Sequence, residues 1–400
     1  MWARKQIDIG WYDLAYGIFL CLVDWQTESA PFTFKLHSGH GDRNWLLTLT
    51  ERTAFDLLLL AAKLPRGSEV LVSPLNVADM FRILREHGLN PVAVDIELST
   101  LMPSVTELEY RRTDKTRAVL IAPLFGTQPE VSDVSRWARA SNVQLWLDWA
   151  QAYAPGFDGS VEADANLFSF GPIKAKTALG GGLLEIRDQT VSERAERLLS
   201  AFPKQRRASY AMRICKYSLL KLISGYMALY LLNLFRFFNA ERRDRFVNQV
   251  FRNLNKHSEL ILAIRQQACG PLKHMVQRRN AESFASGYQA AGQKLTDKLL
   301  LHGQGTWQLP GLTARKKTHW LFPVVTPQAP KMIRDLQANG WDATSSTRLV
   351  LPSPDDERTC PVAASLLRNL VLIPCYHPMT DADLDKLCQI ITGQHLARST

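Results

Sequence analysis

The sequence predicts an α/β protein whose large domain holds a mainly parallel sheet flanked by helices, followed by a small C-terminal α+β domain. Between about residue 45 and residue 187, short apolar runs alternate with stretches of helical periodicity. From about residue 272 the pattern changes to a long helical stretch, a strand and further helices. Continuous apolar strands alternating with helices are typical of parallel sheets covered on both faces. A chain of 400 residues, 46% of them hydrophobic, can bury such a core.

The elements follow one another in a regular order. In the large domain we expect helices at 53–64, 77–87 and 131–141, and strands at 69–73, 91–95, 118–122, 144–148, 166–170 and 182–186. In the small domain we expect a helical stretch at 272–301, a strand at 320–325, and helices at 331–339 and 381–392. We divide the chain into an N-terminal segment 1–44, a large domain 45–205, an apolar and basic helical insertion 206–260, and a small domain 261–400.

The charge and the cysteine content of the chain argue against a nucleic-acid-binding protein, a metalloprotein and a secreted protein. The net charge is +10 and the pI is near 9.3, with much of the excess between Lys204 and Lys256. The sequence has no zinc-finger spacing and no aromatic RNA-binding motif, so we expect no nucleic-acid partner. The six cysteines are scattered, without a CxxC pair or metal spacing. This pattern indicates reduced thiols, no metal site and a cytoplasmic protein, for which we expect no signal peptide.

Several polar groups are expected at the carboxyl ends of the strands, where open α/β sheets bind their ligands. A strand ends at Asp148, and the strand that holds Ser169 runs into Gly171 and Lys174. Thr53 and Ala54 open a helix, whose free N–H groups favour a phosphate. Taken singly, each residue has a structural explanation: a solvated lysine, a helix cap or a space-filling serine. Their combination and order predict a common site.

The combination suits pyridoxal phosphate. A lysine amine forms an imine with the cofactor, and a carboxylate beside the pyridine nitrogen keeps that nitrogen protonated. Hydroxyl groups and helix N–H groups hold the phosphate.

These residues occur in motifs that resemble the DegT/DnrJ/EryC1/StrS family of aminotransferases. The motifs are Glu51-Arg-Thr-Ala-Phe55, Gly67-Ser-Glu-Val-Leu-Val72, Asp148-Trp-Ala-Gln151, Ser169-Phe-Gly-Pro-Ile-Lys174 and Leu372–Asp383. The lysine motif is the most specific of the five. The resemblance covers roughly 45–187 and 315–395, and it implies a pyridoxal-phosphate-dependent transferase of fold type I.

The resemblance also implies residue roles and partners. Lys174 would hold the cofactor through an imine, Asp148 would pair with the pyridine nitrogen, and Gln151 would lie near the ring hydroxyl. Ser169, with the helix start at Thr53 and Ala54, would bind the phosphate. An amino acid donor, a small-molecule keto acceptor and a homodimer are implied as partners.

The sequence departs from the family pattern in three places. Val77 stands where the family usually has an aromatic residue that stacks on the cofactor ring. The family's Gly-x-Asn-x-Arg segment, through which a partner subunit reaches the phosphate, is not recognisable, although Ser209-Tyr-Ala-Met-Arg213 resembles a remnant. The apolar segment 209–238 is unusual for the family.

A helix over 218–238 would be about 31 Å long, close to the thickness of a bilayer's hydrocarbon core. A membrane span is disfavoured because it would separate the two domains. Two interpretations remain: a helical insertion that packs on the enzyme or on a second subunit, and a peripheral contact with the inner face of the membrane that the apolar stretch 11–23 would join.

The function predicted first is an aminotransferase that acts on a keto-sugar, nucleotide- or lipid-linked, in cell-surface polysaccharide or natural-product biosynthesis. One alternative is another reaction at Cα or Cβ of a hydrophobic substrate, although dehydratases of the family typically carry His at the position of Lys174. The other alternative is a non-catalytic, membrane-associated scaffold of the same fold.

Overall fold

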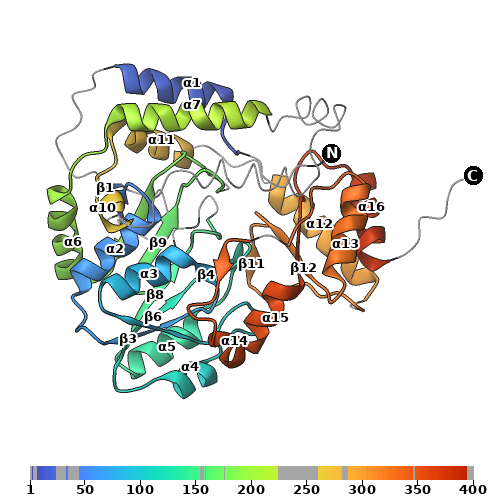
Figure 1. Cartoon of the computed structure of the whole chain (residues 1–400), viewed down its shortest axis with the longest axis horizontal. Helices are drawn as coiled ribbons and strands as arrows, with labels where there is room; N and C mark the ends of the chain where they lie inside the picture. Colours follow the sequence, from blue (N-terminus) through green and yellow to red (C-terminus); the bar gives the residue numbers. More distant parts are fainter. Residues whose placement is uncertain are drawn as a thin grey trace, which may run out of the picture.

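The computed structural model describes residues 2, 7–23, 33–34, 45–153, 157, 159–174, 176–223, 260–281, 287–303, 305–345 and 347–393. Within these residues the centre is an eight-stranded sheet of order β1-β2-β10-β9-β8-β6-β3-β5 (Figure 1). The strands from β9 to β5 are parallel, and β10, β2 and β1 continue the sheet in antiparallel pairing. Their bounds are β1 (Thr33–Phe34), β2 (Trp45–Thr48), β3 (Glu69–Val72), β5 (Asn90–Ala93), β6 (Thr116–Ile121), β8 (Gln144–Asp148), β9 (Ala165–Ser169) and β10 (Gly182–Ile186).

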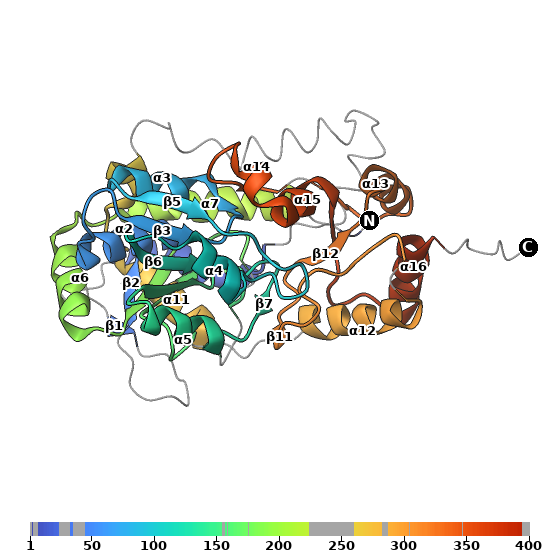
Figure 2. The same ribbon diagram turned by 90° about the horizontal axis from the view of Figure 1, so that it is seen from below.

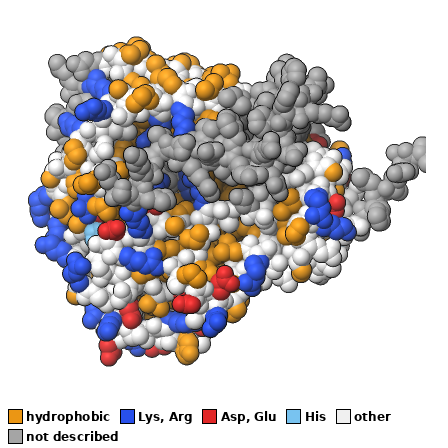
Figure 3. All heavy atoms as spheres, viewed as in Figure 1, with side chains coloured by type: hydrophobic (Ala, Val, Ile, Leu, Met, Phe, Trp, Pro, Cys, Tyr) orange, Lys and Arg blue, Asp and Glu red, His pale blue; other side chains and the backbone are white. Residues whose placement is uncertain are grey.

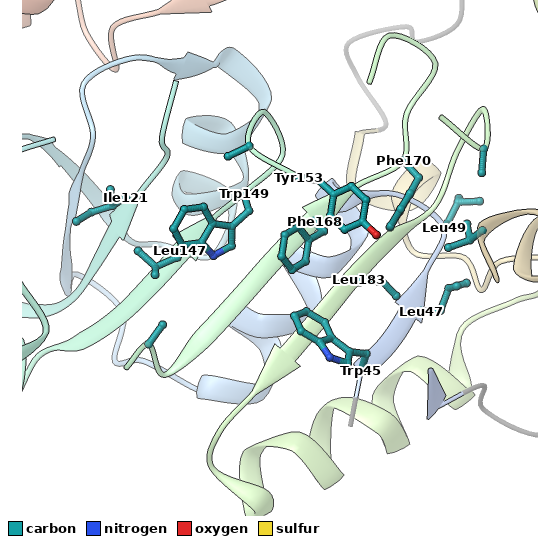
Figure 4. Packing of buried hydrophobic residues seen from close by; sticks show 14 of the residues in the cluster. Trp45, Leu47, Leu49, Ile121, Leu147, Trp149, Tyr153, Phe168, Phe170 and Leu183 are labelled. Atoms are coloured by element: carbon teal, nitrogen blue, oxygen red, sulfur yellow. The ribbon is translucent and has the colours of Figure 1, made fainter. Parts of the chain in front are cut away.

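Helices cover both faces of this sheet because successive strand side chains point to opposite faces. On β8, Leu145 and Leu147 enter one buried cluster and Trp146 enters the other. Figure 4 shows part of the first cluster, in which the rings of Trp45 and Phe168 lie 5.3 Å apart. The helices of the first face are α1 (Trp11–Leu22), α4 (Val105–Arg111), α5 (Ser132–Ala140), α7 (Arg207–Ile223) and α11 (Gly270–Ala281), and those of the second are α2 (Glu51–Ala62), α3 (Ala78–Glu86), α6 (Gln189–Ala201) and α10 (Leu260–Ile264).

The C-terminal part has its own core. Strands β12 (Phe322–Val325) and β14 (Leu370–Ile373) pair antiparallel, and three helices pack on them. These are α12 (Gly287–Leu301), α13 (Ala329–Ala338) and α16 (Asp381–Thr392), which lie at the end of the molecule away from the large sheet (Figure 2). The short helices α14 (Asp356–Thr359) and α15 (Pro361–Asn369) lie between the C-terminal part and the sheet. The predicted α/β fold with a mainly parallel sheet and a small α+β part is confirmed.

Two short ladders tie the C-terminal part to the sheet. Strand β13 (Leu349–Val350) pairs with β4 (Asn76–Val77), and β11 (Lys316–Lys317) pairs with β7 (Thr127–Gln128). The hydrophobic clusters also bear on the domain boundaries. Helices α10 and α11 share clusters with the sheet, and the separate C-terminal cluster begins in α12. The predicted boundaries, including the one at 261, stay predictions.

Most predicted elements exist, with shifted ends. Strands β8 and β10 and helix α16 have the predicted bounds. Helix α2 begins two residues before the predicted Thr53, because the Thr50 side chain caps it by accepting the Thr53 N–H. The strand predicted from 320 begins at Phe322, because His319 takes a left-handed conformation with φ 52°. The stretch 272–301 is described as α11 and α12, with 282–286 outside the described residues.

The unusual segment 209–238 is described only to residue 223, as part of α7. The inner side of α7 is buried in the core through Tyr210, Ile214 and Tyr217, and the helix packs on α1 and α11. In the part of the chain that the structure describes, no helix combines the length and the apolar character that crossing a bilayer requires. The remaining residues of that segment, 224–238, lie outside the described part.

Candidate active site

Three of the predicted site residues meet at one edge of the sheet. Asp148 is the last residue of β8 and Ser169 the last of β9, and Lys174 follows β9 in a turn closed by its N–H, which donates to the Gly171 carbonyl at 3.1 Å. Because β8 and β9 are parallel neighbours, their carboxyl ends lie at the same edge. The start of α2 reaches this edge through the bridge between Thr50 and Gly181.

Asp148 is buried and held on both carboxylate oxygens. Its Oδ1 accepts the Ala150 N–H at 3.0 Å, and its Oδ2 accepts the Asn76 side-chain amide at 3.2 Å. The other end of that amide, Asn76 Oδ1, accepts the Val77 N–H at 2.7 Å. The carboxylate of Asp148 is therefore fixed in direction before any ligand binds. The sequence reasoning missed Asn76, which follows β3 by a few residues.

A second carboxyl, Glu51, lies against Asp148. Glu51 is the first residue of α2, and its side chain hydrogen-bonds to Asp148. Burial raises the pKa of Glu51 well above its usual range, and the charge of Asp148 raises it further. Two adjacent carboxyls disfavour a second negative charge, and this repulsion adds to burial in raising the pKa of Glu51. Glu51 stands inside the Glu51–Phe55 motif, but only Thr53 and Ala54 were singled out there.

The Lys174 amine lies near this carboxyl pair. Burial lowers the pKa of Lys174, the carboxyls of Glu51 and Asp148 act in the opposite direction, and the cations Arg52 and Arg348 add to the lowering. The Nζ atom lies 5.2 Å from the centroid of the Trp320 ring. A lowered pKa increases the neutral fraction of the amine, which is the nucleophilic form.

Trp320 and Arg348 come from the C-terminal part and were missed by the sequence reasoning. The β13–β4 ladder brings Arg348, the residue before β13, beside Asn76 and Val77. Trp320 follows the left-handed residue His319 and precedes β12. No local pattern indicates either residue, because both reach the site through pairing distant in sequence.

The start of α2 offers two donors. Its cap satisfies two of the first N–H groups: the Thr53 N–H donates to Thr50 Oγ1 at 3.2 Å, and the Ala54 N–H donates to the Thr50 carbonyl at 3.0 Å. Among the described residues, the N–H groups of Glu51 and Arg52 have no hydrogen-bond partner. Such free N–H groups at a helix N-terminus attract anions.

Glycine is required where the next strand passes this helix start. A Cβ at Gly182 would lie 2.6 Å from the Glu51 nitrogen, closer than any real contact. Gly181 has φ 91°, in the left-handed region. The three successive glycines at 180–182 leave the backbone room for this close approach.

The other predicted site residues make contacts within the protein. The Thr53 hydroxyl donates to the Ile264 carbonyl at 2.8 Å, and Gln151 Oε1 accepts the Phe125 N–H at 2.9 Å. Val77 is half-buried in the β4–β13 ladder. Ser169 is buried, with Oγ 3.5 Å from the Gly171 nitrogen. The cofactor contacts predicted for these residues stay predictions.

Arg213, in the suggested remnant of the family's phosphate-binding segment, lies in α7. Its Nη1 donates to the Leu179 carbonyl at 3.3 Å, and a Cβ at Gly180 would lie 2.8 Å from the same nitrogen. The side chain thus contacts the turn between β9 and β10 of its own chain.

Comparison with known proteins assigns the chain to a family. Residues 32–392 match the DegT/DnrJ/EryC1/StrS aminotransferase family, and the chain belongs to it. The family depends on pyridoxal phosphate, as predicted from the motifs.

Relatives by sequence include the GDP-perosamine synthase of Escherichia coli O157:H7, 26% identical over 42% of this chain and 49% of that protein. Another is the dTDP-4-dehydro-2,3,6-trideoxy-D-glucose 4-aminotransferase of Saccharopolyspora spinosa, 24% identical over 43% of this chain and 46% of that protein. The chain thus matches about half the length of these relatives.

Solved structures share the fold over nearly the whole chain. An aminotransferase from Psychrobacter cryohalolentis superposes with a TM-score of 0.69 at 15% identity, covering 96% of each chain. DesV of S. venezuelae, solved in complex with a ketimine intermediate, superposes with a TM-score of 0.65 at 17% identity, covering 96% of this chain and 95% of DesV.

The residues at the sheet edge fit the family's cofactor in charge and type. The two free N–H groups at the start of α2 suit a phosphate. The fixed carboxylate of Asp148 suits a protonated ring nitrogen. The Lys174 amine, with its lowered pKa, suits an imine-forming lysine.

Proposed function

We propose that this protein is a pyridoxal-phosphate-dependent aminotransferase that moves an amino group from an amino acid donor to a keto-sugar. The acceptor is nucleotide- or lipid-linked and belongs to cell-surface polysaccharide or natural-product biosynthesis. One observation carries the proposal: a half-buried lysine amine of lowered pKa lies near a fixed carboxylate and the free start of a helix, within the fold of this family. Relatives named as keto-sugar aminotransferases support the choice of acceptor.

In this proposal each group has one task. The N–H groups of Glu51 and Arg52, held by the capped helix start at Thr53 and Ala54, bind the cofactor's phosphate together with Ser169. Asp148 holds the proton on the ring nitrogen, and Asn76 keeps the Asp148 carboxylate in position. Gln151 lies near the ring hydroxyl, and Val77 lies beside the ring.

Lys174 performs the proton transfer. When bound, pyridoxal phosphate supplies a carbonyl that condenses with amines and a ring that accepts electrons. The Nζ of Lys174 would take the proton from the substrate's Cα, and its lowered pKa favours the neutral form that accepts a proton. Burial favours this role because it lowers the pKa of the amine. Trp320 covers the amine on one side and limits its access to water.

We also propose a cytoplasmic homodimer whose segment 209–238 contacts the inner face of the membrane. All six cysteines are free thiols, which supports a reducing compartment. Light scattering coupled to size-exclusion chromatography measures the oligomeric state, and a monomer at micromolar concentration would contradict the dimer.

The visible absorbance of the purified protein tests the reaction. After reconstitution with pyridoxal phosphate, we expect an absorbance band that borohydride removes and that Lys174→Ala abolishes. An amino donor should convert this band to that of the amine form, and a keto-sugar should restore it. A wild-type protein that stays colourless would overturn the proposal and favour the scaffold.

A control variant at another lysine shows whether the cofactor is attached specifically at Lys174 or to surface amines in general. Lys115 is exposed in a loop, and Lys115→Ala should leave the absorbance band unchanged. Loss of the band in both variants would show that attachment is not specific to Lys174. If the amino donor were consumed without amine-form cofactor accumulating, another reaction at Cα or Cβ would replace transamination.

A further inference from the structure

Helices α1 and α7 pack against each other on the outside of the molecule, over α11 (Figure 1). Their inner sides contribute buried residues to the core, among them Leu14, Leu20, Tyr210 and Ile214. A surface helix normally pairs one apolar stripe with a polar outer face. These two helices do not follow that pattern.

The outer side of α1 is apolar along its length. Its exposed residues recur at intervals of three or four, which places them on one helical face. Tyr12 and Leu22 lie at the two ends of the helix, with exposed fractions of 71% and 81%. The exposed residues of α1 are Trp11, Tyr12, Ala15, Phe19 and Leu22.

The outer side of α7 has the same character. Its exposed apolar residues also recur at intervals of three or four, and Met212 exposes 67% of its surface. They are Ala208, Met212, Cys215, Leu219 and Leu222. We call the combined outer sides of α1 and α7, made of these residues and those of α1, the α1–α7 face.

Exposed hydrophobic side chains are more frequent on α1 and α7 than on the rest of the described surface. Seven of the thirteen large hydrophobic side chains that are exposed in the described part of the chain lie on these two helices. The space-filling view shows hydrophobic side chains gathered over α1 and α7 at the top of the molecule (Figure 3). Contiguous exposed apolar patches mark interaction sites more often than single exposed residues do.

The charges around the face are positive. The sequence of α7 contains four basic residues and no acidic residue: Arg207, Arg213, Lys216 and Lys221. Arg213 points to the turn between β9 and β10, whereas Arg207 and Lys221 donate to backbone carbonyls at the two ends of α1, beside the face. The one acidic residue of α1, Asp13, is buried and pairs with Arg278 at 2.8 Å and Arg279 at 3.2 Å. No carboxylate of either helix therefore opposes an anionic partner.

Cations also lie beside the aromatic residues of the face. Lys221 Nζ lies 5.8 Å from the Trp11 ring centroid, and the Arg278 guanidinium lies 5.2 Å from that of Tyr12. Exposed Trp and Tyr next to Lys and Arg are typical of protein surfaces at the lipid headgroup level, where the rings meet acyl chains and the cations meet phosphates.

We propose that the α1–α7 face binds the surface of an anionic lipid bilayer, with its apolar side chains at the headgroup boundary and the positive charge beside it attracting lipid phosphates. This rests on the peripheral contact proposed above and assigns it to residues of both helices. A second copy of this chain is a poorer occupant, since a two-fold contact through this face would bring together two surfaces of the same positive charge.

Sedimentation of the full-length protein with vesicles tests the proposal. We expect the wild type to pellet with vesicles of phosphatidylcholine and phosphatidylglycerol in equal parts, and to stay in the supernatant with phosphatidylcholine alone. Phe19→Glu combined with Leu219→Glu should weaken binding by roughly tenfold or more, because each change puts a carboxylate against anionic lipid. Leu22→Glu with Leu222→Glu charges the two opposite ends of the face, since Leu22 lies by the start of α7 and Leu222 by the start of α1, and this pair is used if the first pair fails to fold.

The matched control is Leu300→Glu with Leu301→Glu, which charges two exposed leucines of α12 outside the face and should leave vesicle binding unchanged. Wild-type protein that ignores anionic vesicles would overturn the proposal, as would binding that survives both double variants. A change in oligomeric state in the α1 and α7 variants, without vesicle binding by the wild type, would assign the face to a second copy instead. The lysine-dependent absorbance band, recorded on the same samples, reports separately on the proposed reaction.

Discussion

Two carboxyls on the same helix, the half-buried Glu51 and the buried Asp56, have different electrostatic surroundings. Asp56 accepts hydrogen bonds from Arg265 at 2.8 and 3.0 Å, and His87 Nε2 lies 2.8 Å from Asp56 Oδ1. Burial alone would raise the pKa of Asp56, but the hydrogen bonds from His87 and Arg265 and the charge of Arg265 lower it overall. This carboxylate is paired, and its role is to join α2 to α3 and α10.

Glu51 lies against another carboxyl, and burial together with the charge of Asp148 raises its pKa, although the charges of Lys174 and Arg52 act in the opposite direction. A fold gains no stability from setting two carboxyls against each other, whereas an active site uses such pairs to hold a proton where a reaction needs it. The comparison separates a structural charge from a functional one on a single helix. The experiments below test that separation, from the largest expected effect to the smallest.

The substitution Asp148→Asn tests whether the carboxylate of Asp148 serves the reaction. The substitution keeps the shape and an oxygen for the Ala150 N–H, but it removes the negative charge that would hold a proton on the ring nitrogen. Because an adjacent opposite charge shifts a pKa by about 1–3 units, we expect transamination to slow by roughly 10- to 1,000-fold.

The stability of the Asp148→Asn variant toward urea should change little. The exposed Asp114→Asn is the matched control, and it should transaminate at the wild-type rate. A variant of Asp148 that unfolds at much lower urea while keeping its turnover would assign Asp148 to the structural group.

The substitution Asp56→Asn tests whether the carboxylate of Asp56 stabilises the fold. It leaves Arg265 without its carboxylate partner, and we expect the free energy of unfolding to fall by roughly 2–4 kcal/mol in urea titrations at neutral pH. Turnover per folded molecule should stay at the wild-type value.

The pH dependence of the free energy of unfolding shows whether Asp56 stabilises the fold in its charged form. Its pKa is lowered in the folded state, so its stabilising contribution is present above the ordinary value of 3.8 and is lost as pH falls through the folded pKa. The Asp56→Asn variant should lack this part of the acid destabilisation. Equal acid destabilisation in wild type and variant would contradict the pairing.

Glu51→Gln tests the carboxyl that the sequence reasoning overlooked. Because its pKa is raised, Glu51 is neutral at low pH and gains a negative charge as pH rises, beside Asp148 and the anion-binding start of α2. We expect cofactor affinity of the wild type to fall relative to the variant as pH rises, by about tenfold at the alkaline end.

Absorbance titration of cofactor-free protein with pyridoxal phosphate, wild type and variant side by side, measures this difference. Glu193→Gln, on the exposed side of α6, is the control and should follow the wild type. Identical pH profiles for wild type and Glu51→Gln would show that Glu51 stays neutral throughout and has no part in cofactor binding.

The sequence predicted those parts of the fold and site that depend on local patterns. Apolar runs bounded by polar residues gave the bounds of β8 and β10, and the Thr380–Asp383 capping box marks the start that was predicted for α16. Motif spacing predicted Asp148, Ser169 and Lys174 as one site, because parallel strands bring their carboxyl ends together. The start of α2 was misjudged because Thr50 and Thr53 are equally good caps in sequence.

Other features depended on contacts between residues far apart in the chain. Asn76 acts on Asp148 from another strand end, and Trp320 and Arg348 arrive through strands of the C-terminal part. The pairing of Glu51 with Asp148 needs β8 and α2 to meet at one edge of the sheet. None of these contacts leaves a periodic signal, because each is made by a single side chain.

The amino-acid sequence by itself thus determined the class of fold and the family and predicted the lysine of the site, since these follow from periodicity and motif spacing. Tertiary structure alone decided which carboxyl on α2 is paired with cations and which faces Asp148. It also decided that α1 and α7, apolar on both sides, expose one of those sides. The physical reason is the same in both cases: burial and electrostatic surroundings belong to the assembled fold, not to a residue or its neighbours in sequence.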